Sequence, residues 1–156
     1  MNLFFHQMAI GRIGLAEENG SITNLYFETD PIPQNIESGE TEVIKEGFRQ
    51  LEAYLSGELQ TFSVPLAPRG TDFMRTVWKL LCQVPYGKTA SYKEIAIAAG
   101  SPRAARAVGL ANNKNPVPLF IPCHRIVGAD GKLTGYRGGL HIKKILLDME
   151  KHHGTF

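Results

Sequence analysis

Three short apolar runs lie near the start of the chain, within residues 4–10, 13–15 and 22–27. Runs of this length are typical of strands when turn residues bound them. Asn19-Gly20 separates the second run from the third, and this dipeptide between apolar runs favours a hairpin turn. The pattern therefore predicts a small sheet at the N-terminus.

The next pattern has the period of a helix. It predicts a helix from about Thr41 to Ser56, which Gly57 can close. The apolar face is expected to carry Val43, Phe48, Leu51 and Leu55. Nothing in residues 1–66 gathers catalytic side chains, so this part is interpreted as a structural α/β module.

Residues 64–70 hold prolines and a glycine and are predicted to be a linker, after which the chain becomes helical. The first helix is expected to end near Cys82, which is interpreted as a packed thiol. Its apolar stripe consists of Phe73, Val77, Leu80 and Leu81, with Trp78 beside it.

Two short helices follow. Ser91 and Glu94 have the spacing of a capping box, which predicts a helix through Ala99 that Gly100 ends. Ser101-Pro102 is expected to start the second helix, with Ser as its cap and Pro in its first turn. Two short helices joined by a tight turn predict a helix-turn-helix.

The last part of the chain is predicted to form a hairpin and a helix. Ile126-Val127 and Leu133-Thr134 flank turn residues 129–131, which indicates a hairpin wing beside the helix-turn-helix. The final helix is expected to bury Ile142, Ile145, Leu146 and Met149 and to hold Glu150 near its C-terminal end. A carboxylate is disfavoured there by the helix dipole, which suggests that Glu150 has a partner.

The charge supports a division into 1–66 and 67–156. The formal net charge is +2, yet residues 1–66 hold 3 Lys and Arg against 10 Asp and Glu, whereas residues 67–156 hold 14 against 5. This asymmetry indicates that the second part faces a polyanion. The alternative is that two oppositely charged parts attract each other.

The N-terminus does not resemble a signal peptide, and no apolar run approaches the roughly 18 residues of a membrane span. With Cys82 and Cys123 as its only cysteines, the chain suggests a reducing, cytoplasmic setting. Metal-ligand pairs at zinc spacing are missing from the sequence, so no metal site is expected.

The helix predicted from Ser101 consists mostly of small residues. Arg103 and Arg106 are three positions apart and are therefore expected to share one helix face. Small residues such as Ala105 and Gly109 let a backbone approach DNA closely, and an arginine can insert between bases, which is typical of minor-groove binding. The alternative is an Ala-rich packing helix with two solvated arginines.

Three prolines stiffen the apolar segment 115–122, which delivers Cys123 and His124. A thiol attacks as a thiolate and needs a neighbouring base or positive charge. His124 could be that base, directly or through a water. Without further context, a buried cysteine beside an incidental histidine would be the favoured explanation of the pair.

The context resembles the active-site signature of the methylated-DNA–protein-cysteine methyltransferases, also called O6-alkylguanine-DNA alkyltransferases. The signature is Pro122-Cys123-His124-Arg125 followed by Ile126-Val127. The resemblance covers essentially residues 70–151, through 103–109 and 135–139, and fades before them. Single-domain bacterial members are the most similar.

The resemblance implies a ribonuclease-H-like module followed by a winged helix-turn-helix, and it assigns roles by position. Cys123 would accept the alkyl group, with His124 as its base and Glu150 orienting the imidazole. Asn115 would brace the active-site loop. Arg106 would fill the gap left by a flipped nucleotide, and Tyr92 would assist its rotation. Base contacts would come from Tyr136 and Arg137 and from the backbone around Pro118 and Val127.

The implied function is the direct, single-use reversal of O6-alkylguanine, and less efficiently of O4-alkylthymine, in double-stranded DNA by a monomer that needs no cofactor. The main rival is an alkyltransferase-like protein that binds lesions without repairing them; those relatives replace the acceptor cysteine. The other rivals are a helix-turn-helix transcription regulator and a cysteine hydrolase. Arg137 departs from the family members that carry Ser there, which affects the hydrogen bonding to the base.

Overall fold

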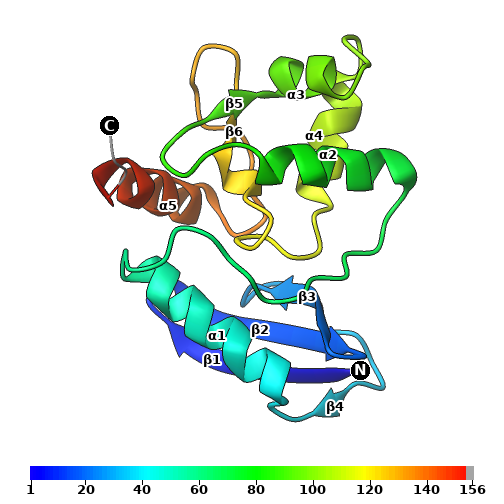
Figure 1. Ribbon diagram of the computed structural model, residues 1–156, viewed down its shortest axis with the longest axis vertical. Helices are drawn as coiled ribbons and strands as arrows, with labels where there is room; N and C mark the ends of the chain where they lie inside the picture. Colours follow the sequence, from blue (N-terminus) through cyan, green and yellow to red (C-terminus); the bar gives the residue numbers. More distant parts are fainter. Residues whose placement is uncertain (154–156) are drawn as a thin grey trace. The chain divides into compact units, whose positions relative to one another are not determined.

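A computed structural model describes residues 1–153 and divides the chain into two compact units, Met1–Arg69 and a second that begins at Gly70 (Figure 1). The predicted division after residue 66 lies close to this point. The last three residues of the predicted second part, 154–156, lie outside the described range.

The first unit is built on a four-stranded sheet with the order β3-β2-β1-β4. Its antiparallel strands are β1 (Asn2–Met8), β2 (Gly11–Glu18) and β3 (Ser21–Tyr26), and the short β4 (Glu37–Ser38) pairs parallel to β1. Asn19 and Gly20 turn the chain between β2 and β3 with φ values of 53° and 82°. The predicted hairpin is therefore confirmed, because its turn needs two residues that tolerate positive φ.

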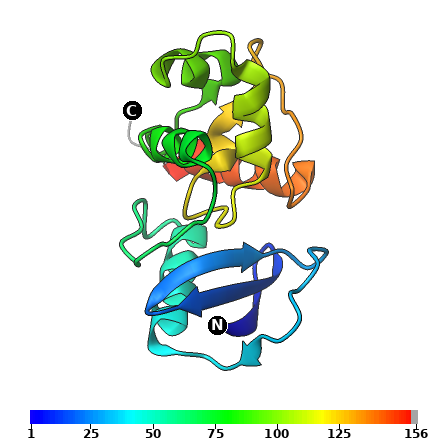
Figure 2. The same cartoon turned by 90° about the vertical axis from the view of Figure 1, so that its right-hand side faces the viewer.

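Helix α1 (Glu42–Leu55) lies across one face of this sheet (Figures 1 and 2). Gly57, at a φ of 83°, follows its end as predicted. Its buried face is rotated from the predicted one, since Val43 and Leu55 are only partly buried. Ile44, Phe48, Leu51 and Tyr54 are the large side chains that this face buries.

The segment predicted to be a linker begins as part of the first unit. Ile22 of β3 donates its backbone N–H to the oxygen of Pro65 at 2.8 Å, and Ala67 donates to the oxygen of Ile22 at 2.8 Å. Val64 is buried beside them. Pro65 is compatible with this pairing because it takes part through its carbonyl oxygen, which does not depend on the N–H that proline lacks.

The second unit begins with α2 (Asp72–Cys82), whose centre is Trp78. The indole Nε1 donates to the oxygen of Ala111 at 2.9 Å, and a Cβ added at Gly70 would lie 2.4 Å from the ring. The helix buries Val77, Trp78 and Leu81, whereas Phe73 and Leu80 are only partly buried. Cys82 is exposed, which makes the expected packed thiol wrong, because one residue beyond Leu81 the helix has turned by about 100°.

The helix-turn-helix is present as α3 (Tyr92–Ala98) and α4 (Ala105–Asn113). The capping box is confirmed: Glu94 N donates to Ser91 Oγ at 3.1 Å, and Ser91 N donates to Glu94 Oε1 at 3.0 Å. The predicted start of the second helix is wrong. Residues 101–104 form a turn, closed by Ala104 N donating to Ser101 O at 2.9 Å, and Ser101 does not cap α4.

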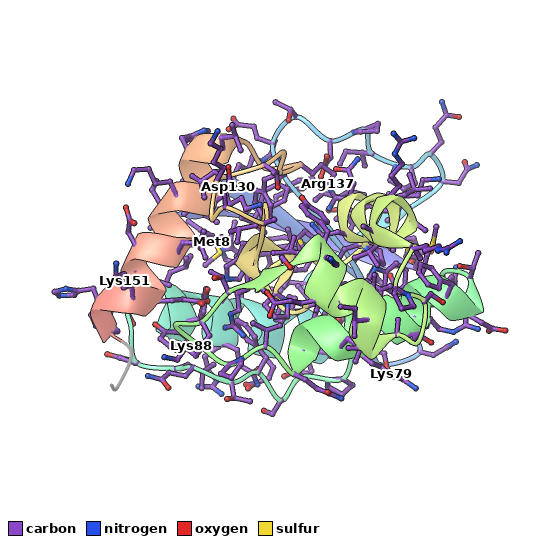
Figure 3. All side chains as sticks on the ribbon, turned by 90° about the horizontal axis from the view of Figure 1, so that it is seen from above. Met8, Lys79, Lys88, Asp130, Arg137 and Lys151 are labelled. Carbon is purple, nitrogen blue, oxygen red and sulfur yellow. The ribbon has the colours of Figure 1, made fainter. Side chains whose placement is uncertain are left out.

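The predicted hairpin wing is also wrong. The strand β6 (Ile126–Val127) pairs parallel to β5 (Ala90–Ser91), which lies just before α3. The loop after it is closed by Gly128 N donating to Lys132 O at 2.9 Å, and within the described residues positions 133–134 are not a strand. Figure 3 labels Asp130 and Arg137 in the segment between β6 and α5.

The chain ends in α5 (Leu140–His153), which buries Ile142, Lys143, Leu146 and Glu150. Ile145, expected in the apolar stripe, is 49% exposed, because the buried face holds two charged residues in place of two apolar ones. Of the helices within residues 1–153, none has both the length and the apolar character to cross a bilayer.

Candidate active site

The amide side chain of Asn115 holds the loop that leads to Cys123. Its Oδ1 accepts from the backbone N–H of Val117 at 3.0 Å, and its Nδ2 donates to the oxygen of Ile121 at 2.9 Å. Between these points, buried Leu119 has a φ of 76°, a left-handed conformation that a branched side chain rarely adopts. Such a conformation persists only where its surroundings fix it, so the loop is rigidly defined.

Cys123 follows this loop in a single 3-10 turn, Cys123–Arg125, and its side chain lines a small pocket. The residue is 4% exposed, and the pocket has a cavity volume of only about 10 Å³. Asparagine amides, glycine and the side chains of the preceding loop form its wall. The lining consists of Asn112, Asn113, Asn115, Pro118, Cys123, Gly135, Tyr136 and Arg137.

The surroundings of the thiol favour its neutral form. Burial raises the pKa of Cys123, and a hydrogen bond with Asn115 and the positive charges of Arg137 and Lys143 oppose that rise only in part. Burial also raises the pKa of Tyr136 well above 10, with the neighbouring Cys123 adding to the rise. Both groups therefore carry their protons at neutral pH.

Behind Cys123, His124 and Arg125 converge on one carboxylate from α5. The imidazole Nε2 lies 2.7 Å from Glu150 Oε2, and the side chains of His124 and Glu150 are 0% and 1% exposed. Arg125 donates through Nε to Oε1 at 2.8 Å and through Nη2 to Oε2 at 2.9 Å. Its Nη1 donates to the oxygen of Val84 at 2.8 Å, and Gly87 N donates to Oε1 at 3.3 Å.

These bonds fix the protonation of the group. Burial alone would raise the pKa of Glu150, but the hydrogen bonds from His124 and Arg125 outweigh it and lower that pKa to about 2. An ionised carboxylate only accepts, so His124 Nε2 must carry a hydrogen. Burial lowers the pKa of His124 despite Glu150, which leaves a neutral imidazole whose basic nitrogen is Nδ1.

A second set of predicted residues lies on the helix-turn-helix. Arg106 is exposed in the first turn of α4, while Ala105 and Gly109 in the same helix are partly buried. Arg103 is exposed but lies in the turn before α4, so the expectation that both arginines share one helix face is wrong. A Cβ at Gly109 would lie 3.6 Å from the ring of Tyr92.

Tyr92 is the first residue of α3, and its side chain contacts Thr134, the residue before Gly135 of the pocket lining. Its hydroxyl shares a hydrogen bond with the hydroxyl of Thr134. Thr134 also accepts from the Nζ of Lys143, which lies 3.3 Å from the backbone oxygen and 3.4 Å from Oγ1. Lys143 is fully buried.

The structure thus brings together most of the predicted site. Asn115, Pro118, Cys123, Tyr136 and Arg137 line one pocket, and His124 with Glu150 lies behind it. Val127 lies buried in β6 and is not part of this lining. Among residues 1–153, no group of three His, Cys, Asp or Glu side chains is placed to hold a metal ion.

Sequence reasoning assigned no role to Arg125 or Lys143. Arg125 is part of the signature of residues 122–127. A charged residue directly before the apolar pair Ile126-Val127 could have indicated a buried ion pair. Lys143 is seven positions before Glu150, a spacing that puts both on one side of a helix, with Leu146 between them.

Two family descriptions match the chain. Residues 5–68 match the ribonuclease-like domain of 6-O-methylguanine DNA methyltransferase, and residues 72–152 match the DNA binding domain of the same enzyme. The first match confirms the ribonuclease-like module implied by the resemblance. The second match identifies residues 72–152 as a DNA-binding domain of this family.

Individual proteins agree with these matches. The methylated-DNA–protein-cysteine methyltransferase of Methanosarcina mazei is 46% identical over 156 residues, covering 97% of this chain and 99% of its own length. The constitutive enzyme of Bacillus subtilis is 44% identical, covering 91% of this chain and 90% of its own.

Solved structures agree as well. A crystal structure of Mycobacterium tuberculosis OGT in complex with DNA matches with a TM-score of 0.93 and 44% identity, covering 98% of this chain and 94% of that one. Because the two family matches span most of the chain, and relatives of nearly equal length are similar throughout, the chain belongs to the methylated-DNA–protein-cysteine methyltransferase family.

Proposed function

We propose that the protein repairs DNA by moving the alkyl group of O6-alkylguanine, and less efficiently that of O4-alkylthymine, onto the sulfur of Cys123. The observation that carries this proposal is the buried thiol of Cys123, followed directly by an imidazole that Glu150 orients from behind. That arrangement supplies a nucleophile, a base and a group that holds the base.

The step balances without a cofactor. The Cys123 thiol passes its proton to His124 Nδ1, directly or through a water, and the sulfur attacks the alkyl carbon. The S–C bond forms as the C–O6 bond breaks, and the electron pair stays with O6. His124 releases the proton that it took from the thiol, and guanine takes up one proton at N1 through water, so the products are an unmodified base, a thioether and neutral His124. Water has no comparable path for cleaving a thioether, so each molecule acts once.

The pocket residues have distinct roles in this proposal. Asn115 fixes the loop through its two backbone hydrogen bonds and also bonds the thiol. Tyr136 offers a protonated hydroxyl to the base, and Arg137 places a positive charge beside it. The backbone around Pro118 and Val127 reads the edge of the base. A cavity of about 10 Å³ holds no base, so these groups must separate when the lesion enters.

DNA is bound through α4, with the minor groove as the target. A base inside a duplex is out of reach of a buried thiol, so the damaged nucleotide must be flipped. Arg106 is exposed at the start of α4 and fills the vacancy. Tyr92 assists rotation of the nucleotide, and Arg103 contacts the DNA backbone. Ala105 and Gly109 are small enough to let the DNA approach α4 closely. The protein acts as a monomer in the cytoplasm.

The alternative is a lesion-binding relative that performs no transfer. Those proteins replace the acceptor cysteine, whereas this chain has Cys123 with its base and orienting carboxylate. A transcription regulator would need more long polar side chains on α4 to read base edges than Arg106 alone supplies.

Mass spectrometry after mixing with a duplex oligonucleotide that carries O6-methylguanine tests the proposal. We expect one methyl group per molecule, located on Cys123, and none on the Cys123→Ser variant. Cys82→Ser is the matched control and should react normally, because Cys82 is exposed at the end of α2. Sustained turnover, or a methyl group on Cys82, would contradict the proposal.

A further inference from the structure

Arg125 is a buried cation that the reaction above does not use. The residue is 7% exposed, and all three of its donating nitrogens have acceptors inside the protein. Two of them form a bidentate pair with Glu150. The same carboxylate also accepts a hydrogen bond from His124 Nε2. A full charge is rarely buried without a specific partner, so this placement calls for an account.

We propose that Arg125 is a positioning residue that keeps His124 neutral, with its hydrogen on Nε2, so that Nδ1 remains the base for Cys123. This inference rests on the proposed alkyl transfer. Arg125 touches neither the thiol nor the base to be repaired in this proposal; it acts through Glu150.

The reason is the charge balance of the buried group. Glu150 alone, in a site of low polarity, would stabilise a protonated imidazole beside it as an ion pair. Arg125 supplies the compensating positive charge, so the carboxylate can stay ionised while His124 stays neutral. The same carboxylate still accepts from His124 Nε2 at 2.7 Å, which fixes the tautomer.

Other charged and titratable groups around this cluster do not replace Arg125. Lys143, from the same helix as Glu150, also disfavours a charged His124, but its nitrogen is hydrogen-bonded to Thr134. The ring of Tyr86 lies 5.7 Å from the Arg125 guanidinium and adds no charge while its hydroxyl is protonated. Cys123, Tyr136 and Cys82 are further titratable groups near the cluster. The pKa of each is raised above its ordinary value, so all three are neutral and add no charge.

The geometry requires arginine rather than lysine. Nε and Nη2 donate to the two oxygens of the Glu150 carboxylate, while Nη1 donates to the backbone oxygen of Val84. A lysine ammonium can supply the charge but not this fork, so Arg125→Lys separates the effect of charge from the effect of geometry.

The experiment measures single-turnover methyl transfer to the full chain as a function of pH, using the free base O6-methylguanine so that DNA binding plays no part. Arg125→Met removes the charge and keeps the length of the side chain. The matched control is Arg49→Met, which removes an arginine from an exposed pair with Glu46 in the first unit. Each rate at about pH 6 is divided by the rate of the same variant at about pH 8.

In wild type and Arg49→Met we expect the two rates to be nearly equal and the ratio to be near one, because in this proposal Arg125 keeps His124 neutral at both pH values. In Arg125→Met the pKa of His124 should rise, so the fall in rate at low pH should begin at a higher pH. If this pKa reaches about 7, the ratio would drop to about one tenth. Arg125→Lys should lose rate but keep a ratio near that of wild type. A ratio unchanged in Arg125→Met, with the rate lowered equally at all pH values, would mean a merely structural role and would overturn the inference.

A measurement on wild type keeps the inference testable if Arg125→Met does not fold. Nitrogen NMR of labelled His124 should show a neutral ring with its hydrogen on Nε2 at about pH 7. A doubly protonated ring, or hydrogen on Nδ1, would overturn the inference. If wild type transfers no methyl group at all, the proposed function fails instead, so the two failures are distinguishable.

Discussion

Glu150 illustrates how one residue can lie where local rules oppose it. A carboxylate near the C-terminal end of a helix faces the negative end of the dipole, and this one is also fully buried. Hydrogen bonds from His124, Arg125 and Gly87 compensate for both effects. The residue is therefore stable only as part of a complete group, and removal of one member leaves another buried charge unpaired.

The pKa of Glu150 leads to a prediction about acid stability. Because the folded value is about 2 against an ordinary 4.5, the stabilisation is fully present above pH 4.5 and is lost as the pH falls toward 2. The difference corresponds to roughly 3 kcal/mol in the free energy of unfolding. Urea unfolding at several pH values should therefore show that Glu150→Gln is less stable at neutral pH and varies less with pH across this range.

Glu46 provides the matched control for that measurement. Its pKa is also lowered to about 2, mainly by a hydrogen bond with Arg49, but the pair is exposed on α1. Solvent screens such a pair, so Glu46→Gln should leave both the stability and its pH dependence nearly unchanged. Equal effects of the two substitutions would show that burial of Glu150 does not matter.

At the scale of elements, α4 permits a test of base flipping. Arg106→Ala should slow repair of O6-methylguanine in a duplex by tens-fold, because the flipped state loses the side chain that fills the gap, at a cost of a few kcal/mol. Reaction with the free methylated base should keep its rate, since nothing has to be flipped. Single-turnover rates with the two substrates decide, and equal slowing with both would remove Arg106 from flipping.

Local signals predicted the sheet, α1 and α3 well, because each has its own turn or cap. They failed where a non-local partner decides. Ser101-Pro102 has the local signature of a helix start, but the same residue types also favour turns, and the chain turns there. Ile126-Val127 was expected to pair with the segment next to it, whereas its partner is β5, far away in sequence.

The part of the site that consists of contiguous residues could be predicted from the sequence. The signature and its loop identified Cys123, His124 and Asn115 as candidates, and the structure holds them together. The buried face of α5 was misplaced because apolar periodicity assumes that charges point outward. Lys143 and Arg125 are buried by partners on other elements, which a sequence pattern cannot reveal.

At the scale of the whole molecule, the tight packing around Cys123 predicts that repair weakens the fold. A methyl group adds volume at a cavity of about 10 Å³ and ends the hydrogen bonding of the thiol. Overpacking of this kind typically costs about 1–3 kcal/mol, which corresponds to a fall of several degrees in Tm for a protein of roughly this size. Thermal unfolding of methylated and free protein from one batch measures the difference.

Cys82→Ser protein that has been methylated in the same way is the control, because it isolates the change at Cys123. It should show the same fall in Tm as methylated wild type. An unchanged or higher Tm after complete methylation would mean that the pocket accommodates the group without strain, and would refute this expectation.

The unequal exposure of the two cysteines has a practical consequence. Cys82 is open to a thiol reagent in the folded protein, whereas Cys123 is shielded until the chain is unfolded. If Cys123 is the acceptor, a fresh molecule reveals a second reactive thiol on denaturation and a spent molecule does not. Comparing reagent uptake before and after denaturation therefore gives the fraction of used protein in a sample, without radioactive DNA or any added reporter group.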